Sequence, residues 1–234
     1  MQIERELITA ILSLTKQDPA ALELVNRKAK APLSLLGDLL RKMQNDGLVY
    51  VKAGSVETDD VQRLKLAFRA LELGSDLEAI SGLLRWQEFE SMTAAALRSN
   101  GYDVAQNLRF SHMGKRWEVD VVGCRKPIAI CLDCKHWHRG ASPGALRRVV
   151  EEQVQRTAAL AGAIPSPRIH VKCASWEKIE FVPAIVSLPV PRFKFYDSVP
   201  IVPVLQLQSF LTELPAQLGS LKHLTKQIAP RVES

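Results

Sequence analysis

The stretch PIAICLDCKHW, residues 127–137, constrains the fold of this chain more than any other part of its sequence. Its apolar residues run on almost without a break, which is typical of a strand buried at the centre of a sheet. Two charged residues, Asp133 and Lys135, interrupt the run. Burying a carboxylate and an ammonium is costly unless they pair or bind something. The stretch therefore predicts a central strand that carries either a structural salt bridge or a functional site.

The same stretch also contains the residue types of a zinc knuckle, including Cys131 and Cys134. In an extended strand, successive side chains alternate between the two faces of the sheet. Cys131 and Cys134 then point to opposite sides, and no Gly, Pro or Asn favours a turn between them. We therefore expect two small buried thiols. Asp133 and Lys135 share one face and are the residues expected to carry chemistry.

The segments around this strand predict a mixed α/β domain over residues 86–234, with a sheet flanked by helices. A helix is expected from Trp86 to Asn100 and another from Ser142-Pro143 onward. The strands expected before the central one are 103–112 and 115–124, joined by the turn HMGK. Further strand signals lie at 168–176, 179–188 and 199–207, and a last helix at 207–218. The fold class predicted is α/β (α+β).

Residues 1–59 have the element order of a winged-helix domain, which they resemble in that order only. Helices are predicted at 3–15, 18–30 and 31–47, followed by two short strands around Ala53-Gly54. We expect Asp18 to cap the second helix, with Pro19 in its first turn. On one face of the third helix we expect a set of apolar residues, namely Leu35, Leu36, Leu39, Leu40 and Met43.

In a DNA-binding winged helix the third helix enters the major groove, so Arg41 and Lys42 are candidate DNA contacts. Asp38 and Asp46 lie on or beside the same helix, which leaves open a domain that dimerises or binds protein instead. Residues 60–85 read as two further helices, capped at Ser75 or Asp76, and are interpreted as a helical connector between the domains.

Other carboxylates are available to join Asp133 and Lys135. Asp120 lies on the preceding strand in an equally apolar setting, and Glu90 follows the inward-facing Phe89. Carboxylates from three elements that converge on one edge form a site for Mg²⁺ or Mn²⁺, which prefer oxygen ligands. A lysine beside the ion can position a water or offset charge on a phosphate.

The segments FE, GYDV, EVDVVG and CLDCKHW occur in this order and resemble the PD-(D/E)xK nuclease superfamily. Mrr-like and archaeal Holliday-junction-resolvase-like enzymes are the most similar members, and the resemblance spans roughly residues 86–163. It implies a restriction-endonuclease-like fold, Glu90, Asp120 and Asp133 as catalytic metal ligands, and Lys135 as the catalytic lysine. The chain departs from the common pattern in having Val119, not proline, before Asp120.

The choice of glutamate stays open among Glu90, Glu88 and Glu118. The resemblance also implies that the helix after the Asp-x-Lys strand flanks the site, where Gln153 is a candidate catalytic residue or part of a solvated face. Arg139, in the loop at the strand end, is a candidate contact for backbone phosphate.

The charge distribution favours a polyanionic partner for the second domain. Residues 1–60 hold 8 of the 31 Lys and Arg residues but 9 of the 25 Asp and Glu residues, so the remainder of the chain is basic. DNA is the partner predicted, and the same chemistry leaves RNA open. Similarity to junction-resolving enzymes implies a homodimer, because two strands must be cut.

No apolar run approaches the roughly 20 residues of a membrane span, and no signal peptide is evident. Four cysteines are too few for a disulfide scaffold. We therefore expect a cytoplasmic protein that does not enter a membrane.

Together these features predict a metal-dependent DNA endonuclease acting in repair, recombination or restriction. Two alternatives remain open. One is a catalytically inactive DNA-binding accessory protein or a structural protein of a repair complex. The other is a winged-helix transcriptional regulator, for which a recognition helix richer in Lys and Arg would be expected.

Overall fold

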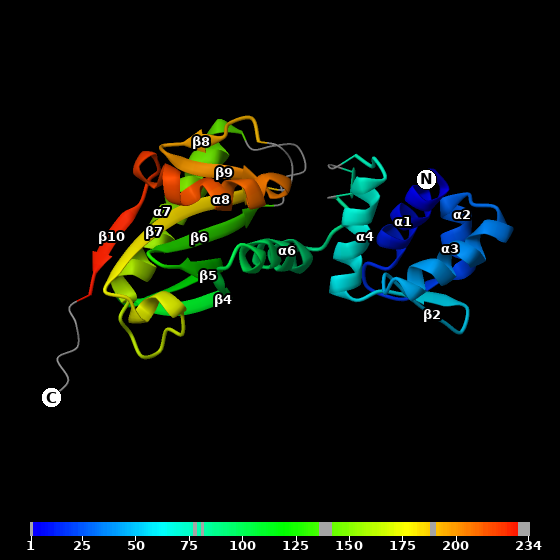
Figure 1. The fold of residues 1–234 in the computed structure, drawn as a ribbon, viewed down its shortest axis with the longest axis horizontal. Coiled ribbons are helices and arrows are strands. Elements are labelled where there is room, and N and C mark those ends of the chain that lie inside the picture. Colours follow the sequence, from blue (N-terminus) through cyan, green and yellow to red (C-terminus); the bar gives the residue numbers. More distant parts are fainter. Residues whose placement is uncertain (1, 77–78, 81, 136–141, 188–190, 229–234) are drawn as a thin grey trace. The chain divides into compact units, whose positions relative to one another are not determined.

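The structure is a computed structural model that describes residues 2–76, 79–80, 82–135, 142–187 and 191–228. The chain divides into two compact units, Met1–Phe89 and Glu90–Ser234, which are drawn in blue to cyan and in green to red in Figure 1. The fold is mixed α/β, as predicted. Within the described residues, no helix has the length and apolar character needed to cross a membrane.

The first unit combines helices with a small antiparallel sheet of order β1-β3-β2. Its elements are α1 (Gln2–Leu14), β1 (Ala20–Ala21), α2 (Leu22–Ala29), α3 (Leu33–Asn45), β2 (Tyr50–Lys52), β3 (Ser55–Glu57) and α4 (Asp60–Glu72). The hairpin turn falls at Ala53 and Gly54, which both have positive φ, 48° and 78°. Two successive positive φ values are typical of the tight turns that match strand twist, so the predicted hairpin is confirmed.

Two expectations for this unit are wrong. Asp18 does not cap the second helix, which begins at Leu22 with no side-chain cap. Ala20 pairs instead with Val56 of β3, so cross-strand hydrogen bonding overrides the local capping signal. Leu35 does not join the buried face of α3, since 44% of it is exposed. The inward stripe is narrower and runs through Leu36, Leu40 and Met43.

Residues 60–85, expected to be a helical connector, include residues of the hydrophobic core of the first unit. Asp59 and Gln62 form a capping box that starts α4. The buried residues that this region adds to the core are Leu66, Ala67, Ala70, Ile80 and Leu84. The predicted cap at Asp76 is present, because its Oδ1 accepts a hydrogen bond from the backbone N–H of Ala79 at 2.8 Å.

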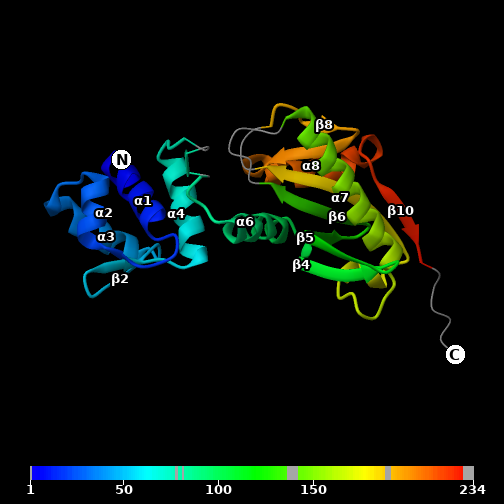
Figure 2. The same ribbon diagram turned by 180° about the vertical axis from the view of Figure 1, so that it is seen from behind.

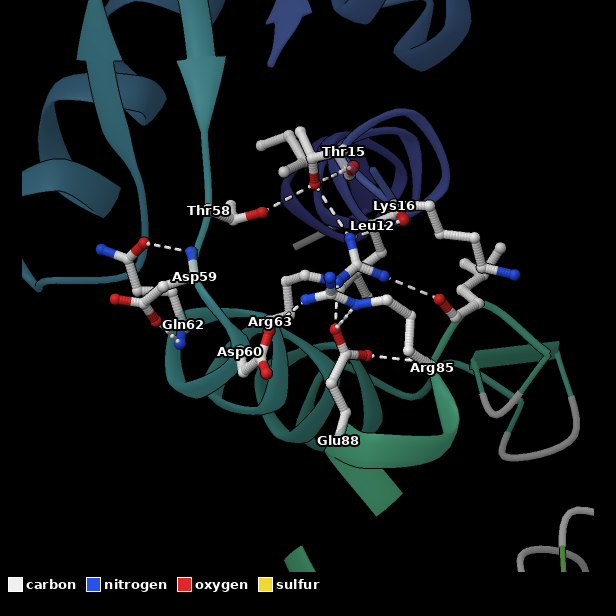
Figure 3. A network of polar contacts seen from close by, with 12 residues as sticks. Leu12, Thr15, Lys16, Thr58, Asp59, Asp60, Gln62, Arg63, Arg85 and Glu88 are labelled. Atoms are coloured by element: carbon white, nitrogen blue, oxygen red, sulfur yellow. Dashed lines mark hydrogen bonds and ion pairs between the residues drawn. The ribbon is translucent and has the colours of Figure 1, made fainter. Parts of the chain in front are cut away.

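A buried arginine ties α1, α4 and the start of the next helix together (Figure 3). Arg63 is fully buried, and its Nε donates to Glu88 Oε1 at 2.6 Å. Its other donors reach the carbonyl oxygens of Leu12 and Leu83 and the hydroxyl of Thr15. Because every guanidinium nitrogen has a partner, this buried charge is well compensated.

The second unit is built on one mixed sheet. Its elements are α6 (Trp86–Ser99, whose first turn belongs to the first unit), β4 (Asp103–His112), β5 (Lys115–Arg125), β6 (Ile128–Lys135), α7 (Pro143–Ala163), β7 (Lys178–Ser187), β8 (Phe195–Tyr196), β9 (Val199–Pro203), α8 (Leu207–Gln217) and β10 (Leu224–Gln227). The strand order is β4-β5-β6-β7-β9-β8, and β10 pairs with β7. Strand β5 is antiparallel to both β4 and β6, whereas β6 and β7 are parallel.

Helices cover both faces of this sheet. Helix α7 crosses one face (Figure 2), and α8 lies on the other (Figure 1). Helix α6 approaches β5 so closely that a Cβ added to Gly123 would lie 2.7 Å from Leu97 Cδ2. Strand β6 is buried from Ile128 to Cys134, so the prediction of a central strand is confirmed.

Two strand predictions fail in this unit. The stretch 168–176 contains no strand and forms a 3₁₀ turn at Lys172–Ser175. Its buried residues Ile169, Val171 and Cys173 alternate as in a strand, but they belong to a hydrophobic core cluster that also contains residues of α7. The strand expected at 199–207 ends at Pro203, which has no N–H to continue a ladder, and a 3₁₀ turn follows.

Candidate functional site

Strand pairing brings Asp120 and Asp133 together. Val121 pairs with Leu132 and Val122 with Cys131, so the same register puts Asp120 opposite Asp133. Residues opposite each other in an antiparallel pair point to the same face. On the other side of β5, Asp120 falls opposite Asn107, whose φ is 50°. An unusual backbone conformation therefore lies beside the carboxylate.

Asp120 is held by the backbone of the next strand. Its Oδ2 accepts a hydrogen bond from the N–H of Cys134 at 2.8 Å. Burial, followed by the nearby carboxylates of Asp133 and Glu90, raises the pKa of Asp120 to about 6, against the Cys134 N–H and Lys135, which lower it. A carboxylate that is costly to ionise for these reasons marks a candidate functional site.

Asp133 is almost fully buried and has two cationic partners. Lys135 Nζ lies 3.0 Å from Oδ1 and 2.8 Å from Oδ2. Arg156 Nη1, from α7, donates to Oδ1 at 2.6 Å. The hydrogen bond of Lys135 goes to Oδ1, so Oδ2 is a buried acceptor with an ion pair but no hydrogen bond. One oxygen of Asp133 therefore retains capacity for a ligand.

Glu90 lies on α6 and is 5% exposed. The negative charge of Glu90, like that of Asp133, raises the pKa of Asp120. All three carboxylates raise the pKa of the Cys134 thiol, after burial, which is the largest cause. The electrostatic influence of Glu90 on Asp120 and Cys134 indicates that Glu90 lies near the two aspartates at the end of β6.

The two other glutamates are engaged elsewhere. Glu88 is fully buried and accepts hydrogen bonds from Arg63 and Arg85 within the first unit. Glu118 lies on the exposed surface of β5 and pairs with Arg109 at 3.0 Å. Among the three alternatives, Glu90 is the one whose charge is coupled to the aspartates.

The cysteines behave as buried thiols. All four are free and buried. Cys134 Sγ contacts Thr93 of α6 at 3.6 Å, whereas Cys131 faces Thr157 of α7. The two thiols thus point to opposite faces of the sheet, as strand alternation predicts. Burial raises the pKa of Cys131 to about 12, so this thiol stays protonated.

Gln153 is fully buried on α7, where its side chain hydrogen-bonds to the backbone of β6 instead of to a carboxylate of the site. Its Nε2 donates to the carbonyl oxygen of Cys131 at 2.7 Å. Its Oε1 is a buried acceptor without a hydrogen bond. The sequence did not single out Arg156 as a site residue, although its position three residues after Gln153 puts it on the same helix face.

The predicted nucleic-acid contacts receive little support from their surroundings. Arg41 and Lys42 are exposed on α3, and Arg41 lies 3.5 Å from Asp38 on the same helix. Arg139 lies outside the described residues, as do the histidines and Trp137 that follow Lys135. Among the described residues, no contact of Arg41 or Lys42 indicates a ligand.

The donor set suits a hard divalent cation, although the side chains are not gathered around one. Within the described residues, no three His, Cys, Asp or Glu side chains stand close enough to hold a metal. Asp120 and Asp133 instead turn oxygens toward the Cys134 N–H, Lys135 and Arg156. Asp120 and Asp133, which face each other across β5 and β6, are oxygen donors of the kind that Mg²⁺ prefers.

A cavity of about 560 Å³ opens beside Asp120. Its lining combines three basic residues, three carboxylates, an aromatic ring and an amide, namely Lys115, Arg116, Arg156, Glu118, Asp120, Glu152, Trp117 and Gln155. Lys115 Nζ lies 3.9 Å from the centre of the Trp117 ring. The cavity therefore joins a carboxylate of the site to a polar surface of mixed charge that carries an aromatic ring.

Comparisons with known proteins leave the family open. No family model matches the chain. An uncharacterized protein from Archaeoglobus fulgidus is 27% identical over 131 residues, which cover 56% of this chain and 92% of that protein. A structure search matches the crystal structure of protein VC1899 from Vibrio cholerae at 15% identity and a TM-score of 0.40. That match covers 94% of this chain, which spans about half, 53%, of the VC1899 chain.

Proposed function

We propose that this protein is a metal-dependent nuclease that hydrolyses phosphodiester bonds in DNA. The observation that carries the proposal is the pairing register of β5 and β6, which sets Asp120 opposite Asp133 at the end of a buried strand that also bears Lys135. Burial and the charges of Asp133 and Glu90 raise the pKa of Asp120, so its ionised form is costly to stability. A metal-binding role accounts for that cost.

We further propose that the second unit is a restriction-endonuclease-like domain and the first a winged-helix domain. The element order α6, β4, β5, β6, α7, β7 supports the former, with the carboxylates on the elements that the sequence resemblance implies. Helices α1, α2 and α3 followed by the β2–β3 hairpin support the latter. DNA contact by Arg41 and Lys42 belongs to the same proposal.

Asp120 and Asp133 would hold the metal, with Glu90 completing the site directly or through water. A divalent ion there would lower the pKa of a bound water and polarise the phosphate. The two aspartates already face each other across β5 and β6, so their backbones need not move to share a ligand. The N–H of Cys134 keeps Asp120 aimed at this edge of the sheet.

Lys135 supplies fixed positive charge. Its ammonium lies within 3.0 Å of Asp133 and is about a quarter exposed, at 23% of the side chain. It can therefore reach a phosphate oxygen at the surface of the site without leaving the carboxylate region. A cation so placed stabilises negative charge that develops on phosphate during hydrolysis.

Cleavage of a panel of labelled DNAs tests the proposal. Single strand, duplex, flap and four-way junction would be incubated with Mg²⁺ or Mn²⁺, with EDTA as the control. We expect cleavage that requires metal and is lost in Asp133→Ala. RNA of the same sequences would show whether the sugar matters. Binding without cleavage by wild type and variant alike would instead indicate the accessory or regulatory alternatives.

A further inference from the structure

We propose that Arg156 is a phosphate-binding residue of this site, held on Asp133 until a metal takes that carboxylate and then released to the substrate. The inference rests on the proposed function and adds a residue to it. Arg156 makes a short hydrogen bond to the buried carboxylate, at 2.6 Å. Its side chain is 26% exposed, whereas that of Asp133 is 2% exposed. The guanidinium therefore lies between the buried carboxylate and solvent.

Two cationic side chains lie beside the single carboxylate of Asp133. Lys135 and Arg156 both contact its Oδ1, so two cations share one carboxylate. A divalent ion bound by Asp133 would repel both of them and compete for the same oxygen. Lys135 is on the same strand and cannot move far from the site, whereas Arg156 reaches it from α7 through a long side chain. Arg156 is therefore the cation that a metal would displace.

The cavity beside Asp120 can receive the displaced guanidinium group of Arg156. Arg156 lines the cavity that also contains Asp120, Lys115, Arg116 and Trp117. Its alternative anion is Glu152, one turn earlier on α7, but Nη2 is 3.7 Å from that carboxylate, beyond hydrogen-bond length. Of the guanidinium nitrogens of Arg156, Nη1 is the one that donates a hydrogen bond to Asp133 in the described structure. The remaining N–H groups are available for the paired contacts that guanidinium groups make with phosphate.

The charges also balance in this arrangement. Three carboxylates at the site stand against the two cations Lys135 and Arg156, which leaves one negative charge. A divalent ion changes the sum to one positive charge, and a bridging phosphodiester of the substrate neutralises it. Metal and substrate would then bind most favourably together, with Arg156 moving between the two anions.

The test compares Arg156→Gln and Arg156→Lys with Arg148→Gln. Arg148 is a matched control, because it lies on the same helix and approaches the same Glu152 at 3.7 Å but is 79% exposed. Affinity for Mn²⁺ would be measured by calorimetry at pH 8 without nucleic acid. Single-turnover cleavage of the substrate that wild type cuts would be measured at saturating Mn²⁺.

We expect Arg156→Gln to bind Mn²⁺ roughly tenfold more tightly, because a competing cation is gone. We expect the same variant to cut about 10- to 100-fold more slowly, because a charged hydrogen bond to phosphate is lost. A residue that only supported the fold would not improve metal affinity. Arg148→Gln should match wild type in both measurements.

The outcomes separate the two proposals. If wild type binds Mn²⁺ and cuts while Arg156→Gln equals it in both, the inference about Arg156 is overturned and the nuclease proposal stands. If wild type does neither, the nuclease proposal fails and the inference fails with it. Should Arg156→Gln not fold, Arg156→Lys decides, since lysine keeps the charge but not the paired donors. Slower cleavage by Arg156→Lys supports the inference, and wild-type cleavage overturns it.

Discussion

Replacing Asp120 by asparagine is expected to stabilise the protein at pH 8 while removing its ability to hold metal. Burial and the neighbouring carboxylates raise the pKa of Asp120 to about 6, from an ordinary value of 3.8. The folded state therefore binds the proton more tightly than the unfolded state does. The stability that this proton contributes is present below about pH 4 and is lost as pH rises through 6. Above that range the ionised carboxylate costs about 3 kcal/mol.

Asparagine keeps the shape and an acceptor for the Cys134 N–H but carries no charge. Asp120→Asn should therefore raise the free energy of unfolding by up to about 3 kcal/mol at pH 8, and by only about 1 kcal/mol at pH 4.5. Urea unfolding in EDTA, followed by tryptophan fluorescence, measures this difference. Three of the four tryptophans belong to the second unit, Trp117, Trp137 and Trp176, so the signal reports mainly on that unit.

Glu118→Gln is the matched control for this experiment. Glu118 is two residues away on the same strand, but its carboxylate is exposed and paired at the surface with Arg109. Its replacement should change stability by less than about 1 kcal/mol at either pH. A loss of stability in Asp120→Asn at pH 8, or a gain that does not shrink at pH 4.5, would refute the assignment of Asp120 as a strained, ionised carboxylate.

Further predictions concern the lysine, the metal, the buried arginine and a glycine. Lys135→Met should lower the cleavage rate about 100-fold in single-turnover assays while calorimetry still detects Mn²⁺ binding. Mg²⁺ at about 100 times its dissociation constant should stabilise wild type by about 2.7 kcal/mol in urea titrations, and no increase would contradict binding to the folded state. Arg63→Met should lose about 3–5 kcal/mol, because the buried Glu88 loses its fully buried partner and keeps only Arg85; adding Glu88→Leu should restore part of the loss. Gly123→Ala should cost about 1–3 kcal/mol in thermal unfolding, since its Cβ would overlap Leu97.

Much of the sheet could be predicted because its signals are local. Strand β4 begins and ends where expected, and the hairpin to β5 follows its turn residues. The apolar run with Asp133 and Lys135 is the central strand, and alternation correctly separated the two cysteines. The period of side chains along a strand fixes these features before any tertiary contact forms.

Expectations failed where a tertiary contact overrides the local signal. Ala20 pairs with β3, which removes the cap expected at Asp18. Ile169, Val171 and Cys173 alternate like a strand because they line a core, not because they pair with a neighbour. Arg156 was missed as a site residue for the same reason. Its distance from Asp133 in the sequence is 23 residues, and only the packing of α7 on the sheet brings the two together.

The most direct test of the account is the position of Mn²⁺ in crystals of the wild-type protein, located by its anomalous scattering at pH 8. We predict a peak within about 2.5 Å of a carboxylate oxygen of both Asp120 and Asp133, with Arg156 turned away from Asp133. A peak at any other site, or an unchanged Asp133–Arg156 ion pair with no peak between the aspartates, would contradict the claim that these carboxylates form a metal-binding nuclease site.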